Sequence, residues 1–138
     1  NLIAQIDVTN SKDVKAESYL IVANLYFQYL GNLEKARQAV LKSILNNSNS
    51  PYAYKFMAEL YVASALTCKD DWGTKLVNLA AIDKYKKAIE LDNQLNLALN
   101  NKIKDLSHNI PSQQDAFTRG LKEDQELSLP QCRTADKF

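Results

Sequence analysis

Glycine, proline and histidine are scarce in this sequence. Among its 138 residues are three Gly, three Pro and one His. A fold of many short strands joined by tight turns needs more turn formers than this, so the scarcity favours long helices. Three scattered glycines also cannot form the loop that cradles a nucleotide phosphate. We therefore expect an all-α protein without a nucleotide cofactor.

A surplus of charge and a long apolar run are also missing. The formal net charge is +1, and no block of like charge is long enough to form a nucleic-acid-binding arm. No apolar run approaches the roughly 18 residues that span a bilayer. We therefore expect neither a nucleic-acid partner nor a membrane span. The chain starts at Asn1 rather than Met, so we expect a fragment or a processed form, and both the cytoplasm and a bacterial periplasm stay open as its compartment.

Two cysteines, Cys68 and Cys132, stand 64 positions apart without a zinc-knuckle or CxxC pattern nearby. We expect two free thiols, and a single disulfide is the alternative in an oxidising compartment. His108 follows a helical pattern, where the helix dipole favours an exposed cation. A thiol-dependent enzyme would need a cysteine beside His108, and no nucleophile elbow or oxyanion loop supports it. We therefore expect no catalytic residue.

Two small acidic groups lack the ligand spacing of a calcium-binding loop. They are Asp70 with Asp71, and Glu123 with Asp124 and Glu126. We expect helix caps and solvated side chains here, and therefore no metal site.

An internal repeat is the strongest positive signal in the sequence. Residues 19–26 and 54–61 both follow the pattern Tyr-x-x-apolar-Ala-x-Leu-Tyr, at an offset of 35 residues. Residues 36–44 and 81–89 match each other at an offset of 45 residues. Small and apolar residues fall at i, i+3, i+4 and i+7, which is one face of an α-helix. Each unit is therefore predicted to be a pair of helices, with about ten extra residues in the second unit.

The residues between these patterns are typical of helix ends. Gly31 can end one helix, and Asn32 can cap the next. Ser50 and Pro51 form an N-cap followed by proline at the first helical position. Asp70 or its neighbour can cap the helix that runs through residues 81–91.

Residues 31–36 (G-N-L-E-K-A) and 81–93 (A-I-D-K-Y-K-K-A-I-E-L-D-N) resemble tetratricopeptide repeats. In that family the first helix carries a small residue followed three positions on by an aromatic, and the second carries Ala, an aromatic and Ala. The resemblance covers about residues 16–93. It implies stacked antiparallel helical hairpins in a right-handed α-solenoid, and a scaffold that binds other proteins.

The sequence departs from the family pattern in three places. One extra residue precedes Gly31, an inserted loop is expected near residues 65–76, and the closing proline is late in the first unit (Pro51) and absent after the second. Residues 61–68, 80–88 and 110–123 are similar to the C-terminal region of tetratricopeptide proteins from Bacteroides-type bacteria. That narrower resemblance carries no functional residue.

The chain is predicted to divide into four parts. Residues 1–10 are a remnant of an upstream segment, residues 11–93 form two hairpins (about 12–46 and 50–92), residues 94–120 form a capping helix and a short helix, and residues 121–138 are a loop or tail. Leu95, Leu99, Ile103 and Leu106 form the apolar stripe of the cap. Because a helical stack needs about three units, we expect either further repeats upstream or a homo-oligomer.

The first helices of stacked hairpins line the concave face, where a partner binds. By the repeat register this face carries Glu17, Leu20, Asn24, Phe27, Gln28, Tyr52, Lys55, Glu59, Val62 and Ala63. It lacks the cluster of Lys and Arg that clamps a peptide carboxylate. A partner peptide or helix can lie there, and so can the chain's own C-terminal segment. Trp72, at the insert, is either a staple that packs the insert down or an exposed anchor.

We therefore expect a non-catalytic protein–protein interaction module without cofactors, whose partner is a protein or peptide. A structural domain that orients a larger protein is the alternative. A small thiol-dependent enzyme is the less favoured one.

Overall fold

The computed structural model describes residue 6 and residues 11–121, which form helices and connecting turns without a β-strand. The expectation of an all-α protein is therefore confirmed for this part of the chain. The helices are α2 (Lys12–Gln28), α3 (Leu33–Asn46), α4 (Pro51–Ala65), α5 (Asp71–Leu91), α6 (Asn96–Leu106) and α7 (Gln113–Thr118), with the 3₁₀ turns η1 (Asn93–Leu95) and η2 (Ser107–Asn109) at the two ends of α6. None of these helices combines the length and the apolar character needed to cross a bilayer.

Local capping chemistry explains where the helices begin and end. The Asn32 side chain accepts a hydrogen bond of 3.0 Å from the Lys35 N–H, and Asp70 accepts one of 2.7 Å from the Gly73 N–H. Gly31 has φ of +60°, a left-handed conformation that glycine adopts without steric cost at a helix end. Ser50 makes no side-chain capping bond, so α4 starts on the proline at its first position alone.

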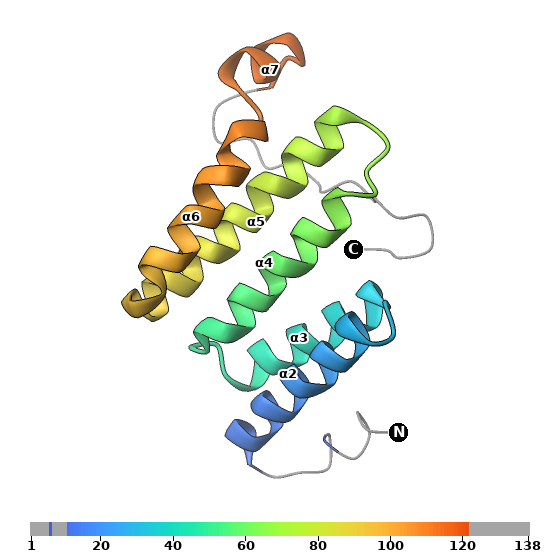
Figure 1. Cartoon of the computed structure of the whole chain (residues 1–138), viewed down its shortest axis with the longest axis vertical. Coiled ribbons are helices and arrows are strands. Elements are labelled where there is room, and N and C mark those ends of the chain that lie inside the picture. The colour runs from blue at the N-terminus through green and yellow to red at the C-terminus, as the bar shows by residue number, and fades with distance from the viewer. Residues whose placement is uncertain (1–5, 7–10, 122–138) are drawn as a thin grey trace.

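The helices follow one another in space as they do along the chain (Figure 1). α2 packs against α3, and α4 against α5, while α3 contacts α4 and α5 contacts α6. One core cluster joins α2, α3 and α4 around Val22, Val40 and Leu60, and a second joins α4, α5 and α6 around Ala58, Tyr85 and Leu99. Helix α4 contributes to both clusters and therefore links the two ends of the molecule.

Small residues let the helices approach closely, as the repeat pattern predicts. Ala23, Ala36, Ala58, Ala81 and Ala88 are each fully buried. Ser43 belongs to the same set, and its buried hydroxyl donates a hydrogen bond of 2.8 Å to the Ala16 carbonyl of α2. A close approach between α2 and α3 is therefore fixed by a polar contact as well as by packing.

The extra residues of the second unit do not form the loop that was expected near residues 65–76. Only residues 66–70 connect α4 to α5, and residues 71–76 are the first turns of α5. Helix α5 is consequently 21 residues long, against 14 for α3. The Asp70 cap lies in the middle of the insert, so the second half of the insert becomes the first turns of the helix that it initiates.

The added turns of α5 provide a seat for the C-terminal part of the described chain. The Asn78 side chain donates a hydrogen bond of 3.0 Å to the Asn109 carbonyl. The Arg119 guanidinium lies 4.1 Å from the centre of the Trp72 ring. The Lys75 ammonium nitrogen lies 3.2 Å from a carboxylate oxygen of Asp115. Trp72 therefore packs against the end of α7, which differs from the staple of the inserted loop that was one of the two alternatives.

Helix α6 covers the last hairpin with the stripe that was predicted. Leu99 is buried, and Leu95, Ile103 and Leu106 pack against the same cluster. α7 begins with a reciprocal capping box between Ser112 and Asp115, and the chain turns at Gly120 with φ of +70°. The predicted remnant at residues 1–10, apart from Ile6, and the predicted tail from residue 122 onward lie outside the described residues.

Candidate functional site

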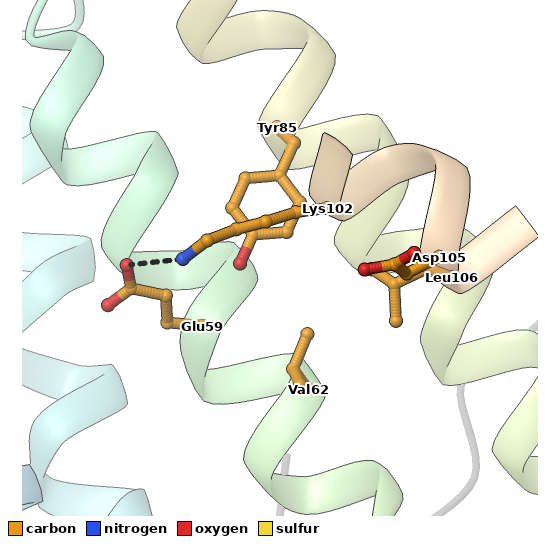
Figure 2. A pocket seen from close by; sticks show the side chains of 6 residues that line it. All are labelled: Glu59, Val62, Tyr85, Lys102, Asp105 and Leu106. Atoms are coloured by element: carbon orange, nitrogen blue, oxygen red, sulfur yellow. Dashed lines mark ion pairs between the residues drawn. The ribbon is translucent and has the colours of Figure 1, made fainter. Parts of the chain in front are cut away.

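A pocket lies where α4, α5 and α6 meet (Figure 2). Its volume is about 310 Å³, at the lower end of the range for ligand-binding pockets. Its lining residues are Glu59 and Val62 of α4, Tyr85 of α5, and Lys102, Asp105 and Leu106 of α6. This size suits a side chain or a short peptide segment better than a whole cofactor.

The interior of the pocket is apolar and its edge is charged. Val62, Tyr85 and Leu106 belong to, or pack against, the second core cluster, so rigid helices hold them in place. Figure 2 shows the Lys102 side chain stretched across the Tyr85 ring toward Glu59. The Lys102 ammonium lies 5.8 Å from the centre of that ring, close enough for a cation–π attraction.

The Glu59 carboxylate lies at the pocket's edge, near two lysine ammonium groups. One of its oxygens lies 3.8 Å from the Lys55 ammonium and 3.9 Å from the Lys102 ammonium. These separations exceed the 2.7–2.9 Å of a charge-assisted hydrogen bond, so neither lysine's N–H groups are saturated by this carboxylate. Both ammonium groups are therefore able to donate hydrogen bonds to a ligand.

Burial and charge act together on the Tyr85 hydroxyl. Burial, and to a smaller extent the neighbouring Glu59 carboxylate, raises the pKa of Tyr85 to about 12. The ionised phenol is disfavoured because its negative charge would be buried away from water and would lie near the negative charge of Glu59. Tyr85 therefore stays a neutral hydroxyl at every physiological pH and is a hydrogen-bond donor rather than a base.

Only part of the predicted concave face contributes to this pocket. Glu59 and Val62 line it, and Lys55 reaches its edge through Glu59. Glu17, Asn24, Gln28 and Tyr52 are exposed, while Leu20 and Ala63 are half-buried against the first core cluster. The structure thus gathers residues of the second unit into a hollow, and the residues of the first unit do not line it.

Phe27, one of the residues predicted on the concave face, packs at the junction of the two hairpins. Its ring contacts Phe56 of α4, with centroids 5.8 Å apart. Phe27 also packs against the first core cluster and is half-buried. Its position therefore serves the junction between the two hairpins.

Sequence reasoning missed four of the six lining residues. Leu106 belongs to the predicted apolar stripe and Tyr85 to the repeat pattern of residues 81–89, and each contributes both to the second core cluster and to the pocket. Lys102 and Asp105 carry no motif, because a pair of charges on a capping helix looks like any solvated face. The sequence indicates only that both residues lie beside the apolar stripe of α6. That position points to the pocket only when the packing of α6 against α4 and α5 is known.

The residues weighed for catalysis lie elsewhere. Cys68 is disulfide-bonded, so the expectation of two free thiols is wrong for this residue, and Cys132 lies outside the described residues. His108 is exposed in η2. Asp70 caps α5 and Asp71 pairs with Lys75, while the second acidic group, from Glu123, is outside the described range. The described residues contain no group of three metal-ligating side chains.

A second hollow, of about 260 Å³, lies beside Trp72 and Lys75 at the start of α5. Its lining side chains already pair with α7 through Asp115 and Arg119. This hollow is therefore the seat of α7, and the α4–α5–α6 pocket is the stronger candidate for a ligand site.

A scan of protein-family models, a search of curated proteins and a search of solved structures each gave no match to this chain.

Proposed function

We propose that this chain is a non-catalytic protein-interaction module of tetratricopeptide type, which holds a side chain of a partner peptide or helix in the α4–α5–α6 pocket. The observation that carries the proposal is the pocket itself, where an apolar interior lies directly beside a charged edge. Such a combination gives an apolar anchor for affinity and polar groups for orientation.

The repeat pattern supports the same proposal. Glu59 and Val62 are two of the residues that the register places on the inner helix of the second unit, and both line the pocket. Binding surfaces of helical repeats are built from inner helices, so the position of the hollow agrees with that mode of recognition. The right-handed stacking that this family implies is part of the proposal.

The chemical states of Tyr85 in the pocket and of Cys68 outside it favour binding over catalysis. The pKa of Tyr85 is raised to about 12, far from the range of a general base at neutral pH. Cys68, as a disulfide-bonded residue, has no thiol to act as a nucleophile. A structural domain that merely orients a larger protein remains the competing function, and it differs in needing no occupant for the pocket.

Selection from a displayed library of random peptides tests the proposal. The bait is the chain, and selected peptides are then compared on Val62→Asp and on Leu79→Asp. Val62 lines the pocket, whereas Leu79 is an exposed leucine of α5 outside it, so the two variants place the same charge at two different sites. We expect peptides that bind wild type and Leu79→Asp alike but lose binding to Val62→Asp. Peptides that bind all three proteins equally would contradict the proposal.

A further inference from the structure

An apolar stripe runs along the outer side of α2. Val14, Ile21 and Leu25 are 51%, 63% and 39% exposed, and Ser18 lies between them on the same side of the helix. At 3.6 residues per turn this side is roughly opposite Phe27, which faces α4. The stripe therefore points away from the rest of the described chain.

The internal repeat shows what such a stripe does when it has a neighbour. Ser18, Ile21 and Leu25 correspond, at the offset of 35 residues, to Ala53, Phe56 and Leu60 of α4. Ala53 and Leu60 have no exposed surface, and Phe56 packs against the first hairpin. Leu25 is 39% exposed where Leu60 is fully buried, because the described chain places no hairpin before α2. The stripe thus has the form of a hairpin-contact surface that lacks its partner.

The spacing of the stripe matches the surface of another helix. Positions 14, 18, 21 and 25 alternate in steps of four and three, which is the seam by which two helices pack along each other. An antiparallel pairing of two such seams places Val14 opposite Leu25, and Ile21 opposite the small Ser18. This pairing sets the large Ile21 side chain against a small one near the centre of the seam.

Charge distribution selects the direction of that pairing. All four charged residues of α2, namely Lys12, Asp13, Lys15 and Glu17, precede Ser18, and residues 18–28 carry none. In a parallel pair each charge would lie beside its own copy, which is unfavourable. In an antiparallel pair the charged half of one helix faces the uncharged half of the other, and the helix dipoles also oppose each other.

The outer side of α6, at the other end of the described helices, does not offer a matching surface. The outer side of α6 carries exposed Asn100, Asn101 and Lys104 around one exposed leucine, Leu97. A head-to-tail contact would bury those polar groups against the stripe without partners. A symmetric contact, in which the same surface of both copies meets, avoids this cost and closes after two copies.

We propose that α2 is a self-association surface, which pairs antiparallel with α2 of a second copy of this chain about a two-fold axis near Ser18 and Ile21. This inference is independent of the pocket, because it rests on α2 alone. The dimer leaves the α4–α5–α6 pocket of each copy open, so two binding sites are joined in one particle.

Sedimentation equilibrium of the 138-residue chain tests the inference. We expect a reversible monomer–dimer equilibrium for wild type. Ile21→Lys, which buries a charge at the centre of the seam, is expected to raise the dimer Kd by at least about tenfold. Leu97→Lys is the matched control, because it adds the same charge to the exposed leucine of α6 and is expected to leave the Kd unchanged. Circular dichroism of each variant checks that the helices are retained.

A charge-swap mixture identifies the surface directly. Ile21→Lys and Ile21→Glu alone should each dimerise at least about tenfold more weakly than wild type, whereas an equimolar mixture should recover dimer formation, because the two residues 21 lie close to each other across the axis. A wild-type chain that remains monomeric at every loading concentration would overturn the inference. So would an Ile21→Lys variant that dimerises as wild type does, or a mixture that shows no recovery.

Discussion

The rings of Phe27 on α2 and Phe56 on α4 meet edge to face, with their centroids 5.8 Å apart and their planes at 76°. This geometry is a favoured one for an aromatic pair, and it joins the first helices of the two hairpins. Each Phe also packs against the first core cluster, so the pair lies at the junction of α2, α3 and α4. The relative placement of the two hairpins therefore depends on these two side chains.

Phe27→Ala is expected to lower the free energy of unfolding by about 2 kcal/mol, because a half-buried aromatic ring is removed from the junction. Tyr52→Ala is the control from the same predicted face. Tyr52 is 57% exposed, so its removal should change stability by less than about 0.5 kcal/mol. Urea denaturation measures both. Equal effects of the two substitutions would show that Phe27 is a surface residue after all.

Ser43→Ala tests the polar contact inside the first hairpin. The substitution removes the hydroxyl that donates to the Ala16 carbonyl and leaves that carbonyl without this donor in a buried site. We expect a loss of about 1–3 kcal/mol of unfolding free energy. Ser48→Ala, in the exposed turn before α4, supplies the comparison and should be near neutral. If both variants unfold at the same urea concentration as wild type, the buried bond contributes nothing.

Because the pKa of Tyr85 is raised in the folded chain, we expect the chain to lose stability at high pH. The pKa of Tyr85 is raised from the ordinary 10.0 to about 12 in the folded chain, first by burial and then by Glu59. The unfolded chain therefore releases its phenol proton first, so this contribution to stability is complete below pH 10 and is lost as the pH rises through about 12. Tyr85→Phe should flatten the fall of the urea midpoint over this window, whereas Tyr52→Phe should leave it unchanged. Parallel curves for wild type and Tyr85→Phe would contradict the assignment.

We expect α7 to separate from α5 in acid. The pKa of Asp115 is lowered, first by the Ser112 backbone N–H that donates to it and then by Lys75. Because the folded pKa lies below the ordinary value of 3.8, the contact is intact above that pH and is lost as the pH falls through the lowered pKa. Trp72 is the only tryptophan, so its fluorescence reports the release of α7 from its seat.

Lys75→Ala and Arg119→Ala should reproduce that fluorescence change at neutral pH without lowering the urea midpoint of the core. Lys104→Ala, on the outer side of α6, is the control for the loss of a positive charge. A Trp72 signal that follows global unfolding in every variant would show that α7 and the core come apart together.

The local pattern of the sequence was sufficient to predict the helices. Caps such as Asn32 and Asp70 and the face of small residues that includes Ala23 and Ala58 all act within a few residues of their own position. The stripe of the capping helix was predicted for the same reason, since Leu99 and Ile103 are one turn apart. These features are confirmed because neighbouring residues decide them.

The pocket and the role of the insert could not be predicted in this way. Lys102 becomes a pocket residue only because α6 lies against α4, beside Glu59, which precedes it by 43 positions. The insert was expected to be a loop because the second unit has about ten extra residues between its two helical patterns. In the structure the Asp70 cap turns the second half of the insert into helix, and the lengthened α5 then seats α7. Both features depend on contacts between segments that are far apart in the sequence. The pattern of a single sequence does not show such contacts.

A fluorescence anisotropy titration measures whether the α4–α5–α6 pocket holds a partner's side chain. A labelled peptide selected on wild type is titrated with wild type, Val62→Asp and Leu79→Asp. We expect the same Kd for wild type and Leu79→Asp, and a Kd at least about tenfold higher for Val62→Asp, which corresponds to about 1.4 kcal/mol. The same Kd for all three proteins would contradict the proposed function of the pocket.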